Sequence, residues 1–191
     1  TDNSDNNVRI IAPDIFQGKP WPVEKFPEDL NNISQDIYNW ILGFDYETVV
    51  KPIILKEIEK LRYKGVTTFH AVGFCWGGRI VFNLQQEGYV TKIATAHPSL
   101  LSAEKDGQNI KGPICILAGS DDQKDYEELF AHILNGPYAD SSYAERFNNV
   151  RHGYLGARLN RDDPIVSKVA DHSLDIFAQF FTNTGKLSIA K

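Results

Sequence analysis

The sequence predicts an α/β fold with a mostly parallel sheet and helices on both faces. Short apolar runs rich in β-branched residues alternate with longer segments of helical periodicity along the whole chain. Several polar or reactive residues directly follow the apolar runs, which is where parallel α/β sheets place their chemistry. The 191 residues show no internal repeat, so we expect a single domain over 1–191 with a flexible, polar start at 1–7.

The first third of the chain predicts one strand followed by two helices. Residues 8–12 form a short β-branched run that Pro13 ends, which is typical of a buried parallel strand. Three prolines between 17 and 27 predict a loop. Apolar residues at helical spacing then predict helices over 29–44 and 48–64.

The rest of the chain alternates predicted strands with predicted helices. The strand segments are rich in β-branched and aromatic residues, whereas apolar residues in the helical segments recur at intervals of three and four. We expect strands at 67–74, 92–96, 113–118 and 143–150, and helices at 79–87, 125–134 and 164–181.

Composition and charge favour an ordinary globular protein that acts on small molecules. The chain is 42% hydrophobic and 24% charged, with a net charge of −5 and scattered basic residues. We therefore expect no nucleic-acid partner, and no apolar stretch is long enough to predict a membrane partner. Two cysteines favour a reducing compartment, so we expect a cytoplasmic location. Nothing in the sequence indicates an oligomeric state.

The segment Val72-Gly-Phe-Cys-Trp-Gly-Gly-Arg79 carries the clearest chemical signal. Cys75 lies between a predicted strand and a predicted helix in the G-x-nucleophile-x-G pattern, which places a reactive side chain on a sharp turn. A helix N-terminus beside the thiol favours the thiolate, so Cys75 is the predicted nucleophile. The backbone N–H of Trp76 is the predicted oxyanion-hole donor. The alternative is a buried structural cysteine beside packing glycines.

A nucleophilic thiol needs a base, and the base needs an acid that orients it. Asp121 follows a predicted strand directly and is our first candidate for the acid, with Asp122 as its competitor. His152 lies in a loop after the last predicted strand and is followed by Gly153, so it is our candidate base. The order nucleophile, acid, histidine is that of the α/β-hydrolases.

The other histidines are weaker candidates for the catalytic base. His97 ends the strand at 92–96, and we interpret it first as a wall of the substrate pocket and only second as a catalytic partner. Neither cysteine belongs to a C-x-x-C pair, and the histidines are isolated in the sequence. We therefore expect neither a metal nor a cofactor.

Together these residues resemble the dienelactone hydrolase (carboxymethylenebutenolidase) family of α/β-hydrolases. The resemblance covers 8–182 and rests on four motifs, which are APD at 12–14, the Cys75 turn, LAGSD at 117–121 and HGY at 152–154. It implies an α/β-hydrolase fold with Cys75 as nucleophile, His152 as base and Asp121 as acid. It also implies hydrolysis of lactones or small esters without a cofactor. The His-Pro-Ser at 97–99 is similar to the eukaryotic branch.

The sequence departs from the family pattern at its start. Family members normally have further strands and a helix before the position of Val8. A loop there supplies a second oxyanion N–H and a glutamate that contacts the resting cysteine, and nothing in this chain corresponds to either. We therefore interpret the chain as an N-terminally incomplete α/β-hydrolase, which is either a fragment of a longer protein, the interpretation we favour, or a shortened relative.

A second departure concerns substrate binding. Members that act on dienelactone hold the substrate carboxylate with two arginines. Arg158 matches one of these, but no arginine occurs near 31–36 for the other. We expect Trp40 and Tyr154 to line a more apolar pocket instead, together with His97.

Two functional hypotheses follow from the sequence. The first is a cysteine-dependent hydrolase of small lactones or esters that forms an acyl-enzyme on Cys75. The alternative is a non-catalytic or redox-responsive binding protein that retains the hydrolase fold, in which Cys75 oxidises reversibly.

Overall fold

The structure is a computed structural model that describes residues 8–25 and 34–182. The chain divides into two compact units, Thr1–Val66 and Thr67–Lys191. The single-domain expectation for 1–191 stays a prediction, and the expected flexible start at 1–7 lies outside the described residues.

The first unit contains helical segments. They are a short 3-10 helix at Val23–Lys25, α1 at Gln35–Leu42, a π-helical segment at Tyr46–Val50 and α2 at Lys51–Tyr63. Two side-chain caps explain where these helices begin. The Ser34 hydroxyl accepts the N–H of Ile37, and the Asp45 carboxylate accepts the N–H of Thr48. The second predicted helix is confirmed, and the first is confirmed over its described part.

The predicted strand at 8–12 is wrong. These residues belong to no strand or helix, and the side chains of Val8 and Ile10 are 77% and 88% exposed. A strand is stable only beside a hydrogen-bonded neighbour, and the described residues of the first unit contain no other strand. The β-branched run at 8–12 therefore has no partner strand among the described residues of this unit.

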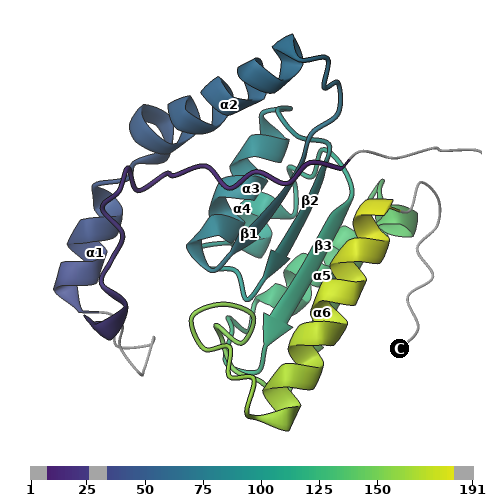
Figure 1. The fold of residues 1–191 in the computed structure, drawn as a ribbon. Coiled ribbons are helices and arrows are strands. Elements are labelled where there is room, and N and C mark those ends of the chain that lie inside the picture. Colours follow the sequence, from purple (N-terminus) through teal and green to yellow (C-terminus); the bar gives the residue numbers. More distant parts are fainter. Residues whose placement is uncertain (1–7, 26–33, 183–191) are drawn as a thin grey trace, which may run out of the picture. The chain divides into compact units, whose positions relative to one another are not determined.

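The second unit is built around a four-stranded parallel sheet (Figure 1). Its strands lie in chain order and are β1 at His70–Phe74, β2 at Lys92–Ala96, β3 at Ile114–Gly119 and β4 at Tyr143–Phe147. The connecting and closing segments are α3 at Trp76–Gln86, α4 at Ala103–Asp106, α5 at Tyr126–Asn135, a 3-10 turn at Ala139–Ser141 and α6 at Pro164–Thr182.

Alternation along β2 puts α3 and α6 on opposite faces of this sheet. Ala94 and Ala96 belong to the buried cluster that α6 completes with Ile176 and Phe177. Thr95 points the other way, and a Cβ added at Gly78 of α3 would overlap its hydroxyl. Figure 1 shows α6 crossing one side of the sheet and α3 lying on the other. The predicted parallel sheet with helices on both faces is confirmed for this unit.

Element boundaries differ little from those that the sequence predicts. The strand at 92–96 is confirmed to the residue, whereas β1 begins only at His70 and β4 ends at Phe147. The short helix α4 is not predicted, because four residues carry no periodicity and it is held by the tertiary contact of Asp106 with Arg79. In the described part of the chain, every helix is too short or too polar to cross a membrane.

Candidate active site

Cys75 occupies the turn between β1 and α3 with left-handed backbone angles, φ 51° and ψ −121°. A non-glycine residue pays a conformational cost for such angles, so the surrounding structure must hold it there. Gly73 lets the helix approach the strand, since a Cβ at this position would overlap the carbonyl group of Gly77. Gly73 is thus explained by close backbone packing at a sharp turn, whereas a Cβ at Gly77 would meet nothing within 4 Å.

Main-chain hydrogen bonds tie this turn to the end of β2. The N–H of Cys75 donates to the Ala96 carbonyl at 3.3 Å, and the Cys75 carbonyl accepts the N–H of Ser99 at 2.9 Å. Because α3 begins at Trp76, the backbone N–H of Trp76 lies in its first turn, next to the thiol. The sequence expectation of a helix N-terminus at Cys75 is therefore confirmed.

His152 follows β4 in a loop, and its ring contacts Asp122 rather than Asp121. Its Nδ1 lies 2.5 Å from Oδ1 of Asp122, whose side chain is only 2% exposed. The other oxygen of this carboxylate accepts the N–H of Gly119 at 2.6 Å. Asp122 is thus fixed in the turn after β3 and holds the imidazole by one nitrogen, which leaves Nε2 for other contacts.

Asp121, our first candidate for the orienting acid, contacts the backbone of the same loop. Its carboxylate accepts the backbone N–H of His152 at 2.5 Å and Nε of Arg151 at 3.0 Å. Burial opposes the charge, but these two hydrogen bonds leave the pKa of Asp121 below its usual value. The geometry corrects the sequence expectation: Asp122 orients the ring, whereas Asp121 positions the loop. The two neighbours point in different directions in the turn, which the sequence did not reveal.

The charge state of His152 is set by its two partners. Burial alone would lower its pKa, but the hydrogen bonds to Asp122 and Cys75 outweigh burial and raise the pKa of His152 to about 9. The imidazolium form therefore predominates at neutral pH. The His152 cation therefore lies beside the Cys75 sulfur.

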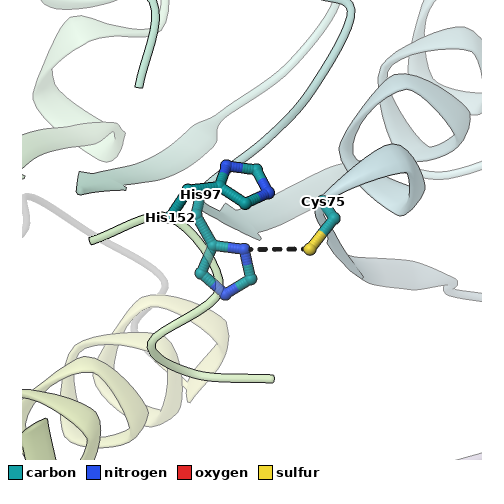
Figure 2. Close-up of side chains that lie close together, drawn as sticks. All are labelled: Cys75, His97 and His152. Atoms are coloured by element: carbon teal, nitrogen blue, oxygen red, sulfur yellow. Dashed lines mark hydrogen bonds between the residues drawn. The ribbon is translucent and has the colours of Figure 1, made fainter. Parts of the chain in front are cut away.

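His97 brings a second imidazole to the same sulfur, as Figure 2 shows. Its Nδ1 lies 3.2 Å from Sγ of Cys75, the contact drawn as a dashed line in Figure 2. The residue is 0% exposed, and its Nε2 has no hydrogen-bond partner among the described residues. Burial, together with the nearby charge of His152, lowers the pKa of His97 to about 3, so this ring is neutral.

The direct contact of His97 with the thiol is the part of the site that sequence reasoning underrated. Its signal was its position at the end of β2, the strand beside the one that leads to Cys75. Its backbone is left-handed, with φ 39°, and its N–H donates to the Leu117 carbonyl at 2.6 Å. His97 is therefore held at the sulfur by its backbone, and is more than a pocket wall.

The remaining expected binding residues lie elsewhere or have other partners. Tyr154 is 1% exposed, and its hydroxyl lies 3.0 Å from that of Ser173, so it belongs to the core and supports the ring of His97 from the side. Arg158 donates from Nη1 to the His152 carbonyl at 3.0 Å. Trp40 belongs to the first unit, where its indole N–H donates to the Lys19 carbonyl at 3.1 Å. Tyr154 is thus a core residue, and the expectation that it lines a substrate pocket stays a prediction.

A cysteine on a strand-to-helix turn, followed along the chain by an aspartate and a histidine that contact each other, defines a site of the α/β-hydrolase type. Comparison with known families agrees with this class. The family model described as "Dienelactone hydrolase family" matches residues 9–184, so its match extends across both units. The chain belongs to the dienelactone hydrolase family, a hydrolase family of α/β-hydrolase fold.

Individual proteins similar to this chain include two fungal relatives and one solved structure. An uncharacterised AIM2 family protein of Schizosaccharomyces pombe is 34% identical over 93% of this chain and 72% of its own length. The hydrolase pyvD of Aspergillus violaceofuscus is 28% identical over 78% of this chain and 59% of its own length. A monoacylglycerol lipase of Paleococcus ferrophilus aligns in structure over 63% of this chain and 74% of its own, with 14% identity and a TM-score of 0.44.

Proposed function

We propose that the protein is a cysteine-dependent hydrolase of small esters, thioesters or lactones that works through an acyl-enzyme on Cys75. One observation carries the proposal: the Cys75 thiol, the His152 ring and the Asp122 carboxylate are joined in sequence at the ends of three different parallel strands. Each group has the partner that its role requires.

In the proposed reaction the Cys75 thiolate attacks the carbonyl carbon of the substrate. The developing oxyanion accepts the backbone N–H of Trp76. The C–O or C–S bond to the leaving group then breaks, and the leaving group takes the proton of the His152 imidazolium. A water molecule next loses a proton to His152 and attacks the thioester, which releases the acid and regenerates the thiol. Asp122 keeps Nδ1 protonated, so that Nε2 performs both proton transfers.

The substrate acyl group is proposed to be neutral, without the carboxylate that two arginines hold in family members acting on dienelactone. Arg158 matches one of the two arginines that bind the substrate carboxylate in the family. Its Nη1 donates to the His152 carbonyl at 3.0 Å. A bidentate clamp on a carboxylate needs two free guanidinium nitrogens in a fixed geometry. Arg158 thus holds the histidine loop, and the sequence has no second arginine at 31–36 to complete a two-arginine clamp on a carboxylate.

The proposal also covers the compartment in which the enzyme acts and the partners that it needs. Both cysteines are free thiols, which suits a reducing compartment such as the cytoplasm. The reaction needs a small-molecule substrate and neither a nucleic-acid nor a membrane partner.

The two cysteines provide a matched test. Cys75 is half-buried at the turn, whereas Cys115 is 0% exposed in β3 and burial strongly raises the pKa of its thiol. We expect iodoacetamide to label Cys75 much faster than Cys115. With p-nitrophenyl acetate, intact-mass measurement should detect an acetyl group on wild-type protein and on Cys115→Ala.

Cys75→Ala should show neither the acetyl mass nor turnover. Retained turnover in Cys75→Ala would overturn the proposal. A wild-type thiol that oxidises reversibly but never gains the acetyl mass would favour the redox-responsive binding protein instead.

A further inference from the structure

The site gathers three donor atoms of the kind that bind transition metals. One sulfur or nitrogen atom from each of Cys75, His97 and His152 lies within 4.8 Å of the other two, and Figure 2 shows the three side chains converging. They come from three segments far apart in the sequence: the turn after β1, the end of β2 and the loop after β4. The isolated histidines that argued against a metal in the sequence are thus brought together by the sheet.

The spacing of these atoms is close to that of a tetrahedral zinc centre. Bonds of about 2.3 Å to sulfur and about 2.0 Å to nitrogen put neighbouring ligand atoms about 3.3–3.7 Å apart. Cys75 Sγ and His97 Nδ1 are already 3.2 Å apart. Small side-chain rotations about fixed backbones are therefore enough to place all three atoms around one ion.

The outer partners also match those of a metal-binding histidine. Nδ1 of His152 lies 2.5 Å from the buried carboxylate of Asp122, so Nε2 is the nitrogen that can bind a metal. A histidine that donates one ring N–H to a carboxylate and binds zinc through the other nitrogen is a recurrent arrangement. His97 turns Nδ1 to the sulfur and its backbone N–H donates to the Leu117 carbonyl, but its Nε2 has no partner among the described residues, so the outer-partner match concerns His152.

We propose that Cys75, His97 and His152 bind one Zn²⁺ ion reversibly and that the bound ion blocks the nucleophile. Zinc favours thiolate and imidazole ligands, and three protein ligands leave a fourth position for water. Binding joins the metal to Sγ of Cys75 and to one nitrogen of each histidine. The thiol and any imidazolium proton pass to solvent, and no atom changes oxidation state. The inhibition rests on the proposed function, whereas the metal binding does not.

The test uses the full chain after chelator treatment and dialysis, with Co²⁺ as a spectroscopic probe and Zn²⁺ in calorimetry. We expect one ion per chain, sulfur-to-Co²⁺ charge-transfer absorption and the intense visible bands of a tetrahedral site. Cys75→Ser should lose the charge-transfer absorption. His97→Gln should weaken Zn²⁺ binding by about tenfold or more. Cys115→Ala and His132→Gln are matched controls that should bind as the wild type does.

Protection of the thiol gives a second readout that is independent of turnover. Zn²⁺ should slow the alkylation of Cys75 by iodoacetamide in the wild type, and a chelator should restore the rate. Circular dichroism establishes that each variant is folded. Charge-transfer absorption that persists in Cys75→Ser, or no saturable binding in the wild type, would overturn the proposal. Unchanged affinity in His97→Gln would overturn the three-residue assignment. None of these outcomes depends on whether an acyl-enzyme forms.

Discussion

The carboxylate of Asp122 lies 2.5 Å from Nδ1 of His152, and its second oxygen accepts the N–H of Gly119. One buried side chain therefore fixes both the histidine ring and the turn that follows β3. Its neighbour Asp121 reaches the same loop but contacts only the backbone N–H of His152 and the side chain of Arg151. The two aspartates can consequently be separated by mutation.

We predict that Asp122→Asn lowers kcat for p-nitrophenyl acetate by about 10²-fold or more, because an amide no longer stabilises the imidazolium or its tautomer. Asp121→Asn should lower kcat by less than about tenfold, since an amide oxygen still accepts the N–H of His152. Steady-state kinetics on both variants, with thermal melts to establish folding, give the comparison. Equal losses, or a larger loss for Asp121→Asn, would contradict the assignment of the acid.

The glycines of the turn provide a second pair. A Cβ at Gly73 would overlap the carbonyl group of Gly77, whereas a Cβ at Gly77 meets nothing within 4 Å. We predict that Gly73→Ala lowers the free energy of unfolding by about 1–3 kcal/mol. Gly77→Ala should leave it unchanged or raise it by up to about 1 kcal/mol, because alanine favours the first turn of α3. Urea denaturation of both variants measures the difference, and a stable Gly73→Ala would show that the turn can widen.

A third prediction concerns the ion pair between α3 and α4. Arg79 donates to Asp106 at 2.8 Å, and the Asp106 side chain is 2% exposed and also accepts the N–H of Ser102. Asp106→Asn should lower the free energy of unfolding by about 2–3 kcal/mol, because the half-buried guanidinium of Arg79 loses its buried, charged partner. The matched control is Asp171→Asn in the exposed pair with Arg161, which should change it by less than about 0.5 kcal/mol. Similar losses of unfolding free energy in both variants would mean that burial of Asp106 does not strengthen its ion pair with Arg79.

A fourth prediction uses the neutral His97. Its pKa is about 3 in the folded protein, against 6.5 for an unperturbed histidine such as that of the unfolded chain. The neutral His97 ring therefore stabilises the folded protein above pH 6.5, and this stabilisation is lost as the pH falls toward 3. The groups facing His97 are His152, Asp121 and the Cys75 thiol. Relative to His97→Gln, the wild type should lose about 1.5 kcal/mol of unfolding free energy between about pH 6.5 and about pH 5.

This comparison is made by denaturant unfolding at each pH, with a chelator present throughout. Because the same groups surround position 97 in both proteins, their titrations largely cancel in the difference. A difference in stability that does not vary with pH would mean that folding leaves the pKa of His97 unchanged, and would contradict the prediction.

The residues of the site were predictable where their signal is local. The glycines on either side of Cys75 predict the sharp turn. The position of His152 after the last apolar run predicts that it belongs to the site. The choice between Asp121 and Asp122 was not predictable, because it depends on which way each side chain leaves a turn. Nor was the contact of His97 with the sulfur, since it depends on β1 and β2 being neighbours.

The fold was likewise predictable where it depends on local sequence patterns, and not where it depends on tertiary contacts. Periodicity and β-branched composition located the strands and helices of the second unit. The run at 8–12 has the same composition as a buried strand, but strand formation depends on a partner that no local pattern describes. Sequence reasoning fails here because hydrogen bonding between strands is not a property of one segment.

The left-handed backbone at Cys75 also means that the thiol-bearing side chain at this turn lowers the stability of the folded protein. A side chain with a Cβ in this conformation costs on the order of 1 kcal/mol relative to glycine, whether or not substrate is present. The most stable residue at the turn is therefore one without a thiol. Substitutions that stabilise the backbone at this position would therefore remove the proposed nucleophile, so mutations meant to stabilise the protein should leave residue 75 unchanged.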